Sequence, residues 1–196
     1  MIFRPTITEQ PRVPHEQREM GCQPRAPHEQ REMGSLIERY HQPLYWHIRR
    51  MVVSHDDAED VLQNTFMQIF EHISDLRDRK QERAWVYRIA TNEALQWLRS
   101  QHEFVSLDAE DEDSSPLLNT LMTDGYTDTG DELLLLFQQA ILTLPTMQRT
   151  VFNLRYYDEL PYEEIAAVTG STVGAAKTNY HIAKEKISNY ILEVRG

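Results

Sequence analysis

The sequence predicts an all-α protein made of two small helical domains. Over most of the chain, apolar residues recur at spacings of three and four, which is the period of a helix with one buried face. No stretch shows the alternation of apolar and polar residues that marks a β-strand. A strongly acidic segment interrupts the helical pattern, and it predicts a linker between residues 35–100 and residues 132–196.

The composition excludes several classes of protein. The chain has 196 residues, of which 40% are hydrophobic, enough for compact cores. No apolar run approaches the ~18 residues needed to cross a bilayer, and no apolar segment of the secretory type follows the first residues. We therefore expect no membrane insertion and a location in the cytoplasm. The single cysteine, Cys22, excludes an internal disulfide and a cysteine-type zinc site.

A tandem repeat occupies most of the N-terminal segment. QPRVPHEQREMG at 10–21 returns as QPRAPHEQREMG at 23–34, with Val13 replaced by Ala26. The unit is mostly polar, and it is shorter than the ~20–50 residues of a solenoid repeat that buries an apolar face. Residues 1–34 are therefore predicted to be a disordered tail.

Two helical segments are predicted next. From Ser35 the apolar residues follow the helical period, with an interruption at Pro43 that predicts one broken helix or two short ones. Residues 54–73 carry an apolar stripe and acids in the first turn, which predicts an amphipathic helix. Either Ser54 or Asp56 can cap this helix.

A basic loop and a third helix complete this half of the chain. Residues 74–83 have no apolar periodicity, and the helix that follows is predicted to run to about Ser100. Its aromatic side chains could stack on unpaired bases, although large aromatics along a helix more often belong to a core. The spacing favours the core for Trp85 and leaves Tyr87 and Trp97 open.

The charge of the chain is concentrated in one segment. Between Gln101 and Gln148 there are ten acids and no Lys or Arg, so this stretch carries −10 of the net charge of −11. The flanking parts are nearly neutral, and the acidic composition therefore does not exclude a nucleic-acid ligand. Residues 101–131 mix the acids with Ser, Thr, Gly and Pro, which predicts a flexible linker between domains.

The last part of the chain predicts a helix-turn-helix layout. Four helical segments follow the linker, at 132–144, 146–160, 161–170 and 171–194. The third segment ends at Gly170, and the fourth restarts behind Ser171 or Thr172 as an N-cap.

The fourth segment has one apolar and one polar face. The apolar face consists of Val173, Ala176, Tyr180, Ala183 and Ile187. The side chains left outside, with groups suited to a DNA major groove, are Lys177, Thr178, His181 and Lys184. Any two-helix corner of an all-α protein can share this layout, so the segment alone leaves DNA binding open.

The order of three segments along the chain is more specific than any one of them. They are DAEDVLQNTFMQIFEHI (57–73), RAWVYRIATNEALQWLR (83–99) and LTLPTMQRTVFNLRYYDELPYEEIAAVTGSTVGAAKTNYHIAKEKI (142–187). Together they resemble a bacterial RNA polymerase sigma factor of the group IV, extracytoplasmic-function (ECF) type of the sigma-70 family. The resemblance covers Leu36–Ser100 and Glu132–Ile191.

The resemblance implies a role for each half. Residues 35–100 would be a region 2-like domain that docks on the β′ coiled coil of core RNA polymerase and melts the minus-ten promoter element. Residues 132–196 would be a region 4-like domain that reads the minus-thirty-five element and contacts the β flap. The linker, 101–131, would thread polymerase channels that otherwise hold nucleic acid.

The resemblance also implies site residues. Docking on core polymerase would use Glu59, Asp60, Gln63 and Asn64. Contacts with the minus-ten DNA would use Arg77, Arg79, Lys80, Arg83, Arg88, Asn92, Gln96 and Arg99. Contacts with the minus-thirty-five DNA would use Ser171, Thr172, Lys177, Thr178, Asn179, His181 and Lys184.

Some residues depart from the family pattern. The second segment continues as RSQHEF where a basic run is common, and Gln96 stands where many relatives have Asp. The last helix reads KTNYHIA where SRLHRA is usual, so Asn179 and Ile182 replace two frequent arginines. These losses predict weak DNA affinity for the protein alone, with binding that depends on polymerase holding both domains in place.

The sequence therefore predicts a promoter-specificity subunit whose partners are core RNA polymerase, promoter DNA and an anti-sigma factor. It contains no HExxH, phosphate-binding glycine loop or GxSxG, so we expect no enzyme activity, no metal and no cofactor. Two other functions stay open. One is a stand-alone helix-turn-helix regulator that binds duplex DNA as a dimer. The other is a decoy that titrates an anti-sigma factor.

Overall fold

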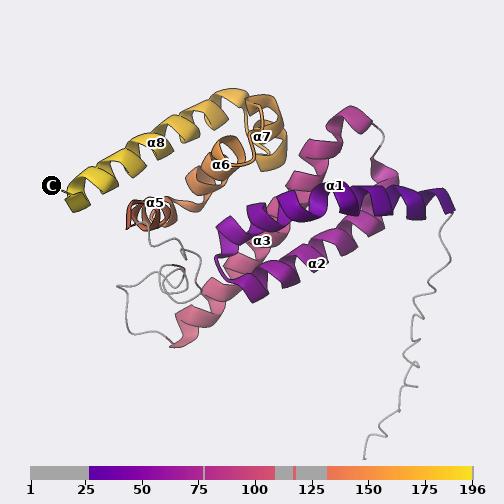
Figure 1. Cartoon of the computed structure of the whole chain (residues 1–196), viewed down its shortest axis with the longest axis horizontal. Helices are drawn as coiled ribbons and strands as arrows, with labels where there is room; N and C mark the ends of the chain where they lie inside the picture. Colours follow the sequence, from indigo (N-terminus) through magenta and orange to yellow (C-terminus); the bar gives the residue numbers. More distant parts are fainter. Residues whose placement is uncertain (1–26, 77, 109–116, 118–131, 196) are drawn as a thin grey trace, which may run out of the picture.

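The computed structural model describes residues 27–76, 78–108, 117 and 132–195 (Figure 1). Within these residues the regular elements are α-helices and short 3-10 turns, so the all-α prediction is confirmed. None of the helices in this part of the chain is long and apolar enough to cross a membrane.

The first three α-helices form a bundle, which we call the N-terminal module. They are α1 (Pro27–Val52), α2 (His55–His72) and α3 (Glu82–Asp108). The 3-10 turns η1 (Ile73–Asp75) and η2 (Arg79–Gln81) connect α2 to α3. Each helix packs against the other two. The core between them includes Leu44, Ile48, Met51, Leu62, Ile69, Val86 and Ala90.

Helix α1 differs from the prediction in two ways. It begins at Pro27, inside the second repeat, rather than at Ser35, and Met33 packs in the core of the bundle. It also continues through Pro43 as one helix, so the predicted break is wrong. Pro43 is exposed, whereas the neighbouring Leu44 is fully buried. Tertiary packing of the apolar face therefore outweighs the hydrogen bond that proline cannot make.

Helix α3 and the segment before it also differ from the prediction. The helix continues past Ser100 to Asp108, into the predicted linker. The predicted basic loop contains the two 3-10 turns, and the Asp78 side chain begins η2 by accepting a hydrogen bond of 2.9 Å from the N–H of Lys80. Apart from Leu117, the rest of the linker lies outside the described residues, as do residues 1–26 of the predicted tail.

The C-terminal module consists of the helices in residues 132–195. They are α5 (Glu132–Leu142), α6 (Thr146–Tyr156), α7 (Tyr162–Thr169) and α8 (Val173–Arg195), which confirms the four predicted helices. Helix α8 packs against each of the other three. The core of this module includes Ala140, Ile141, Leu144, Phe152, Ala183 and Ile187.

The turn between α7 and α8 has helix-turn-helix geometry. Gly170 ends α7 in the left-handed conformation, with φ of 63°. The N–H of Ser171 then donates a hydrogen bond of 3.0 Å to the carbonyl of Ala166. Thr172 caps α8, because its Oγ1 accepts a hydrogen bond of 3.1 Å from the N–H of Ala175. The predicted layout is confirmed at this turn.

Replacing Gly170 by alanine should destabilise the protein through the backbone alone. A Cβ at this position meets nothing within 4 Å, but φ of +63° is strained for any residue with a side chain. We expect Gly170→Ala to lower the free energy of unfolding by about 1 kcal/mol. The matched control is Gly174→Ala, in the first turn of α8, which should leave this free energy unchanged or raise it by up to about 1 kcal/mol. Urea unfolding followed by circular dichroism measures both, and equal effects of the two substitutions would contradict the prediction.

The two modules pack directly against each other. Helix α7 lies against α3, and α6 contacts α1 (Figure 1). A single buried apolar cluster joins the core of α1–α3 to side chains of the C-terminal module, namely Val151, Leu154, Leu160, Ile165, Val168 and Ala176. The sequence is equally consistent with a compact and an extended arrangement of the two halves. The structure is the compact one.

Candidate nucleic-acid interface

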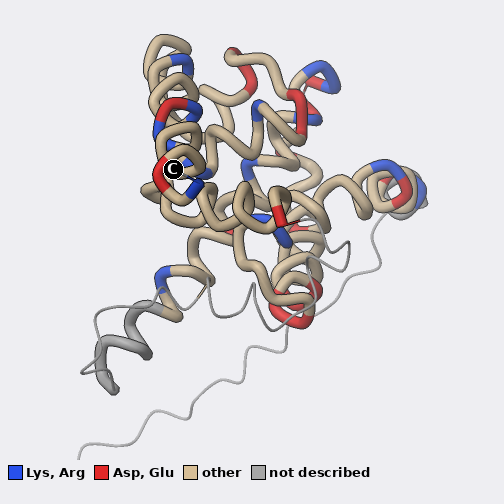
Figure 2. Tube along the Cα trace, turned by 60° about the vertical axis from the view of Figure 1, so that its left-hand side comes forward, with Lys and Arg blue, Asp and Glu red and all other residues tan. Residues whose placement is uncertain are grey.

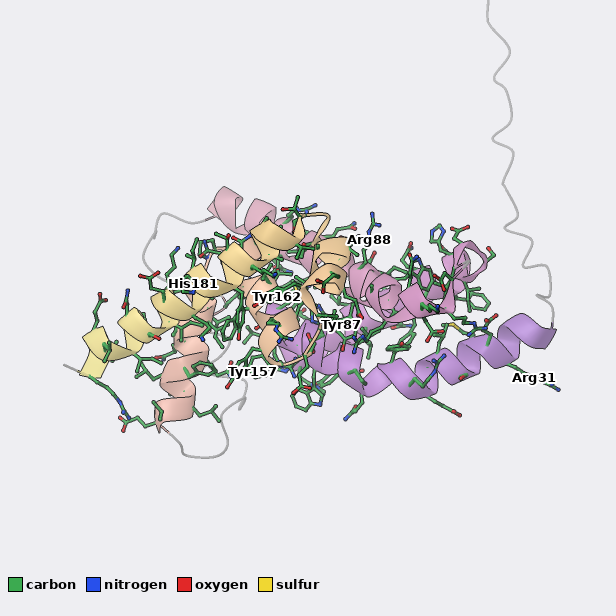
Figure 3. All side chains as sticks on the ribbon, turned by 90° about the horizontal axis from the view of Figure 1, so that it is seen from above. Arg31, Tyr87, Arg88, Tyr157, Tyr162 and His181 are labelled. Carbon is green, nitrogen blue, oxygen red and sulfur yellow. The ribbon has the colours of Figure 1, made fainter. Side chains whose placement is uncertain are left out.

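Helix α8 carries an exposed polar face opposite its buried one. Ala176, Ala183 and Ile187 are buried, as the apolar face predicts. The exposed side chains, which we call the outer face of α8, are Lys177, Thr178, His181 and Lys184. His181 is labelled along this helix in Figure 3. A helix with hydrogen-bonding and cationic groups on one exposed side has the shape and chemistry that a DNA major groove accepts.

Two other residues predicted to contact the minus-thirty-five DNA, Ser171 and Thr172, form hydrogen bonds within the turn between α7 and α8. The hydroxyls of Ser171 and Thr169 lie 2.8 Å apart and form a hydrogen bond, and the Thr172 hydroxyl caps α8. Asn179 is half-buried, unlike the four residues of the outer face. Ser171 and Thr172 therefore position the N-terminus of α8, and the outer face presents the groups that can reach a ligand.

Four of the predicted minus-ten residues form a continuous polar stripe on α3. They are Arg88, Asn92, Gln96 and Arg99, spaced so that they lie one above another along the helix, and all four are exposed. We call them the α3 stripe. The aromatic residues nearby belong largely to the core: Tyr87 is buried, and Trp85 and Trp97 are half-buried against it. The expectation for Trp85 agrees with this packing.

Two of the predicted arginines are engaged in ion pairs. Arg79 pairs with Glu32 of α1 and lies 3.3 Å from Glu82. Arg83 makes a two-pronged contact with Glu164 of α7, with 2.7 Å from Nε to Oε2 and 2.7 Å from NH2 to Oε1. The hydrogen bonds that Arg83 donates to the Glu164 carboxylate raise the pKa of Arg83. Sequence reasoning missed Glu164, because nothing local signals a partner 81 residues away.

Two residues predicted to contact the minus-ten DNA remain, Lys80 and Arg77. Lys80 of η2 is exposed, and Arg77 lies outside the described residues. The structure thus brings Arg88, Asn92, Gln96 and Arg99 together and directs Arg79 and Arg83 to other contacts.

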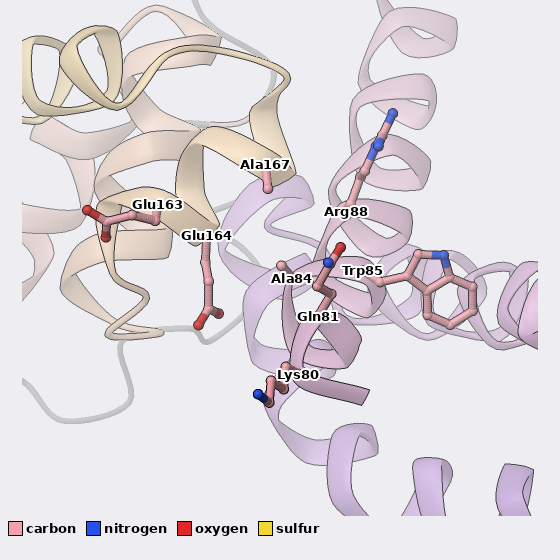
Figure 4. A pocket seen from close by; sticks show the side chains of 8 residues that line it. All are labelled: Lys80, Gln81, Ala84, Trp85, Arg88, Glu163, Glu164 and Ala167. Atoms are coloured by element: carbon pink, nitrogen blue, oxygen red, sulfur yellow. The ribbon is translucent and has the colours of Figure 1, made fainter. Parts of the chain in front are cut away.

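A pocket of about 270 Å³ lies between α3 and α7. From the N-terminal module it is lined by Lys80, Gln81, Ala84, Trp85 and Arg88. The side of α7 contributes Glu163, Glu164 and Ala167 (Figure 4). Glu164 extends toward Lys80 in this pocket, whereas Glu163 points away from Arg88 (Figure 4).

The predicted polymerase-docking residues share one exposed surface of α2. Glu59, Asp60, Gln63 and Asn64 are all exposed, and we call them the α2 surface. The helix begins behind Ser54, whose hydroxyl accepts a hydrogen bond of 3.3 Å from the N–H of Asp57.

A hollow of about 270 Å³ lies within the α2 surface. Its lining adds His41, Leu62 and Phe66 to Glu59, Asp60 and Gln63, and the rings of His41 and Phe66 are stacked with centroids 6.1 Å apart. Phe66 belongs to the apolar stripe predicted within residues 54–73, whereas sequence reasoning did not consider His41. The surface therefore combines acids with an apolar floor, which suits an amphipathic basic helix.

A polar cluster also joins the two modules. The side chain of Asp158, which follows α6, is 4% exposed and lies between two residues of α1. Its Oδ2 is 2.7 Å from His47 Nδ1, and its Oδ1 is 3.1 Å from Arg50 NH1. The Nε2 atom of His47 lies 3.0 Å from the Thr91 hydroxyl of α3. Burial, followed by the nearby Asp158 carboxylate, raises the pKa of the Tyr87 phenol.

Charges of both signs are interspersed on most helices. Figure 2 shows Lys and Arg close to Asp and Glu over the surface of the described residues. Because the charges are interspersed, the interface is defined by particular faces and not by one broad basic patch.

The described residues contain no group of three His, Cys, Asp or Glu side chains placed to hold a metal ion.

Family comparisons match both modules. The family model for sigma-70 region 2 matches residues 36–103, and the model for sigma-70 region 4 matches residues 134–187. The ECF RNA polymerase sigma factor SigW of Bacillus subtilis is 29% identical over 166 residues, covering 82% of this chain and 89% of that protein. The ECF RNA polymerase sigma-E factor of Haemophilus influenzae is 30% identical over 162 residues, covering 80% and 85%.

Two solved structures share the fold. The sigma factor RpoE from Bartonella quintana, in complex with the anti-sigma factor NepR, has a TM-score of 0.66 at 21% identity, covering 82% of this chain and 97% of that one. CnrH, in complex with the cytosolic domain of CnrY, has a TM-score of 0.59 at 23% identity, covering 85% and 91%. The arrangement of helices in both modules therefore has counterparts in known structures.

Proposed function

Because the chain belongs to the ECF sigma factors of the sigma-70 family, we propose a role for each of its exposed faces. As a sigma factor, the protein binds core RNA polymerase and directs promoter-specific initiation. It recognises and melts the minus-ten element and reads the minus-thirty-five element. The stand-alone regulator is not favoured, because the chain carries region 2 as well as region 4.

The presence of an exposed polar face on each module carries the proposal. The N-terminal module presents the α3 stripe, and the C-terminal module presents the outer face of α8. A reader of two separated promoter elements needs one DNA-contacting face on each of two modules. A decoy for an anti-sigma factor needs neither.

We assign docking on the β′ coiled coil to the α2 surface. Its acids and amides border the hollow floored by Leu62 and Phe66. Apolar contact would supply most of the affinity, and the carboxylates would select a basic partner helix. His41 is added to this surface because it lines the same hollow.

We assign contacts with the minus-ten DNA to the α3 stripe and Lys80. The cations Arg88 and Arg99 would hold the backbone, while the amides of Asn92 and Gln96 would reach base edges. Arg83 joins them only when it leaves Glu164.

The outer face of α8 is assigned to the minus-thirty-five element, with Ser171 and Thr172 near the phosphates at the start of the helix. Lys177 and Lys184 would neutralise phosphates, and His181 with Thr178 would face the bases. Only two cations stand on this face, so the isolated module should bind DNA weakly and rely on polymerase for avidity.

The partners follow from these assignments. They are core polymerase through the β′ coiled coil and β flap, promoter DNA, and an anti-sigma factor of the kind bound by the related RpoE structure. The protein supplies no chemistry or cofactor of its own and works in the bacterial cytoplasm, where promoter DNA is found. The predicted tail, 1–34, and the predicted linker, 101–131, both overlap helices, because α1 begins at Pro27 and α3 continues to Asp108.

Run-off transcription tests the function directly. Purified core polymerase is incubated with a library of upstream regions, with and without this protein. Transcripts that depend on the protein and share two spaced upstream elements are expected, and they would identify the promoter. Binding of the protein alone to a two-fold symmetric duplex site, without such transcripts, would support the stand-alone regulator instead.

Replacing Arg88 by alanine should impair strand opening. Loss of one cation from the α3 stripe is expected to reduce open-complex formation on the identified promoter by about tenfold, because a DNA contact is worth ~1–3 kcal/mol. Permanganate reactivity of the minus-ten thymines measures the opening. The control is Arg31→Ala, which removes an exposed arginine of α1 that lies far from Arg88 (Figure 3). Equal reactivity of the two variants would contradict the role given to the stripe.

A further inference from the structure

We propose that the C-terminal module docks on the N-terminal module in the free protein and thereby masks Arg83 from promoter DNA. In this closed state Glu164 forms an ion pair with the guanidinium of Arg83, and Asp158 holds the modules together through its contacts with α1. The masking, though not the closure itself, rests on the proposed function, because it assumes that Arg83 contacts DNA.

The apolar part of the contact is continuous with a core. Leu160 and Ile165 are fully buried, and they belong to the same cluster as Val86 and Ala90 of α3. Helix α7 thus places its apolar side in the interface between modules. Separation of the modules would expose this surface to water, so the closed arrangement is a defined state and not a chance contact.

Asp158 provides a polar contact that only the other module can satisfy. Its nearly buried carboxylate has His47 and Arg50 as its partners, both from α1 and more than 100 residues away in sequence. A buried carboxylate without partners is strongly disfavoured, so its burial and its pairing require each other. Glu159, directly after it, has φ of 53°, a conformation that non-glycine residues rarely adopt. The chain is therefore bent sharply where the carboxylate enters the interface.

Glu164 acts on a different residue, at the edge of the interface. Both of its carboxylate oxygens lie 2.7 Å from nitrogens of Arg83. A guanidinium binds a phosphate with the same bidentate geometry. Since the same donors cannot serve both acceptors, pairing with Glu164 and binding of a DNA phosphate exclude each other. The closed state therefore competes with nucleic acid for this arginine.

The interface also contains polar groups that closure leaves unpaired. Both amide atoms of Asn153 are buried without a hydrogen-bond partner among the described residues. This side chain lines a narrow cavity between the modules, together with Arg50 of α1 and Val53, the residue that follows this helix. Opening would let water form hydrogen bonds with this amide. The free energy gained in this way offsets part of the free-energy cost of exposing the apolar surface of the interface. Closure of this kind is reversible, as a subunit that must engage polymerase requires.

Distances between the modules in the free protein test the closure. In a Cys22→Ser background, spin labels at Met67→Cys of α2 and Glu185→Cys of α8 occupy two exposed positions on different modules. We expect one narrow distance distribution by pulsed electron resonance. Asp158→Ala combined with Glu164→Gln should broaden it and shift it to longer distances, and circular dichroism checks that the helices remain. A broad distribution in the parent protein would overturn the closure, and no change in the variant would overturn the roles given to Asp158 and Glu164.

A charge exchange guards against a variant that simply misfolds. Glu164→Arg alone should open the protein, and combining it with Arg83→Glu should restore the narrow distribution. If the double variant stays as open as the single one, the ion pair does not hold the modules. This measurement uses neither polymerase nor DNA, so its outcome is independent of the run-off assay.

Affinity for single-stranded DNA tests the masking. The probe is a fluorescent single-stranded oligonucleotide of mixed sequence, titrated with the free protein. Glu164→Gln should bind it several-fold more tightly than Glu163→Gln, which removes the same charge from an exposed neighbour on the same turn of α7. Equal affinities would mean that charge alone matters and that Arg83 is not masked.

Discussion

Replacing Lys177 and His181 by alanine is expected to reduce transcription from the cognate promoter by about tenfold to a hundredfold. Both side chains lie on the outer face of α8, where each contact with a base or phosphate is worth ~1–3 kcal/mol and each 1.4 kcal/mol is tenfold. The loss should depend on the promoter, because the minus-thirty-five element is read at this face. Run-off transcription on wild-type and mutated upstream elements measures it.

Lys186 supplies the matched control for this experiment. It is an exposed lysine of the same helix, but it lies on the side opposite Lys177. Lys186→Ala removes the same charge and should leave promoter choice unchanged. If it lowers transcription as much as Lys177→Ala, net charge and not the outer face of α8 controls binding.

Replacing Asp60 and Gln63 by alanine should weaken the complex with core polymerase by about tenfold or more. The two side chains border the hollow of the α2 surface. Truncating a residue at the centre of an interface can weaken the free energy of binding by more than ~1–2 kcal/mol. Because docking precedes promoter recognition, transcription should fall equally on every promoter of the protein. Native gel shift of labelled protein with purified core enzyme measures the affinity.

A control on the same module separates docking from general charge effects. Asp75→Ala removes an exposed acid of η1, outside the α2 surface. It should leave the affinity for core polymerase unchanged. Transcription that recovers at high concentrations of the Asp60 and Gln63 variant is also expected, because only binding is impaired. A defect that persists at saturation would place these residues in a later step.

Most elements of both modules could be predicted because helices are local structures. The spacing of apolar residues marks the buried faces of α2 and α8. The sequence offers two cap residues for each helix, Ser54 or Asp56 and Ser171 or Thr172, and the structure selects Ser54 and Thr172. The residues of the α3 stripe could also be predicted, because residues three and four apart lie on the same face of a helix, so one exposed member indicates the others. The break at Pro43 was predicted from a local rule, and it is wrong because packing across the bundle outweighs that rule.

The sequence by itself determined the helical architecture, the helix-turn-helix and the order of the family segments, since each depends on neighbours within a few turns. Only the tertiary structure decided which cations are paired with carboxylates and how the two modules pack against each other. Arg83 and Glu164 are 81 residues apart, and His47 and Asp158 are 111 residues apart. No periodicity or local spacing reports such pairs, because they form only when packing of α7 on α3 brings distant side chains together.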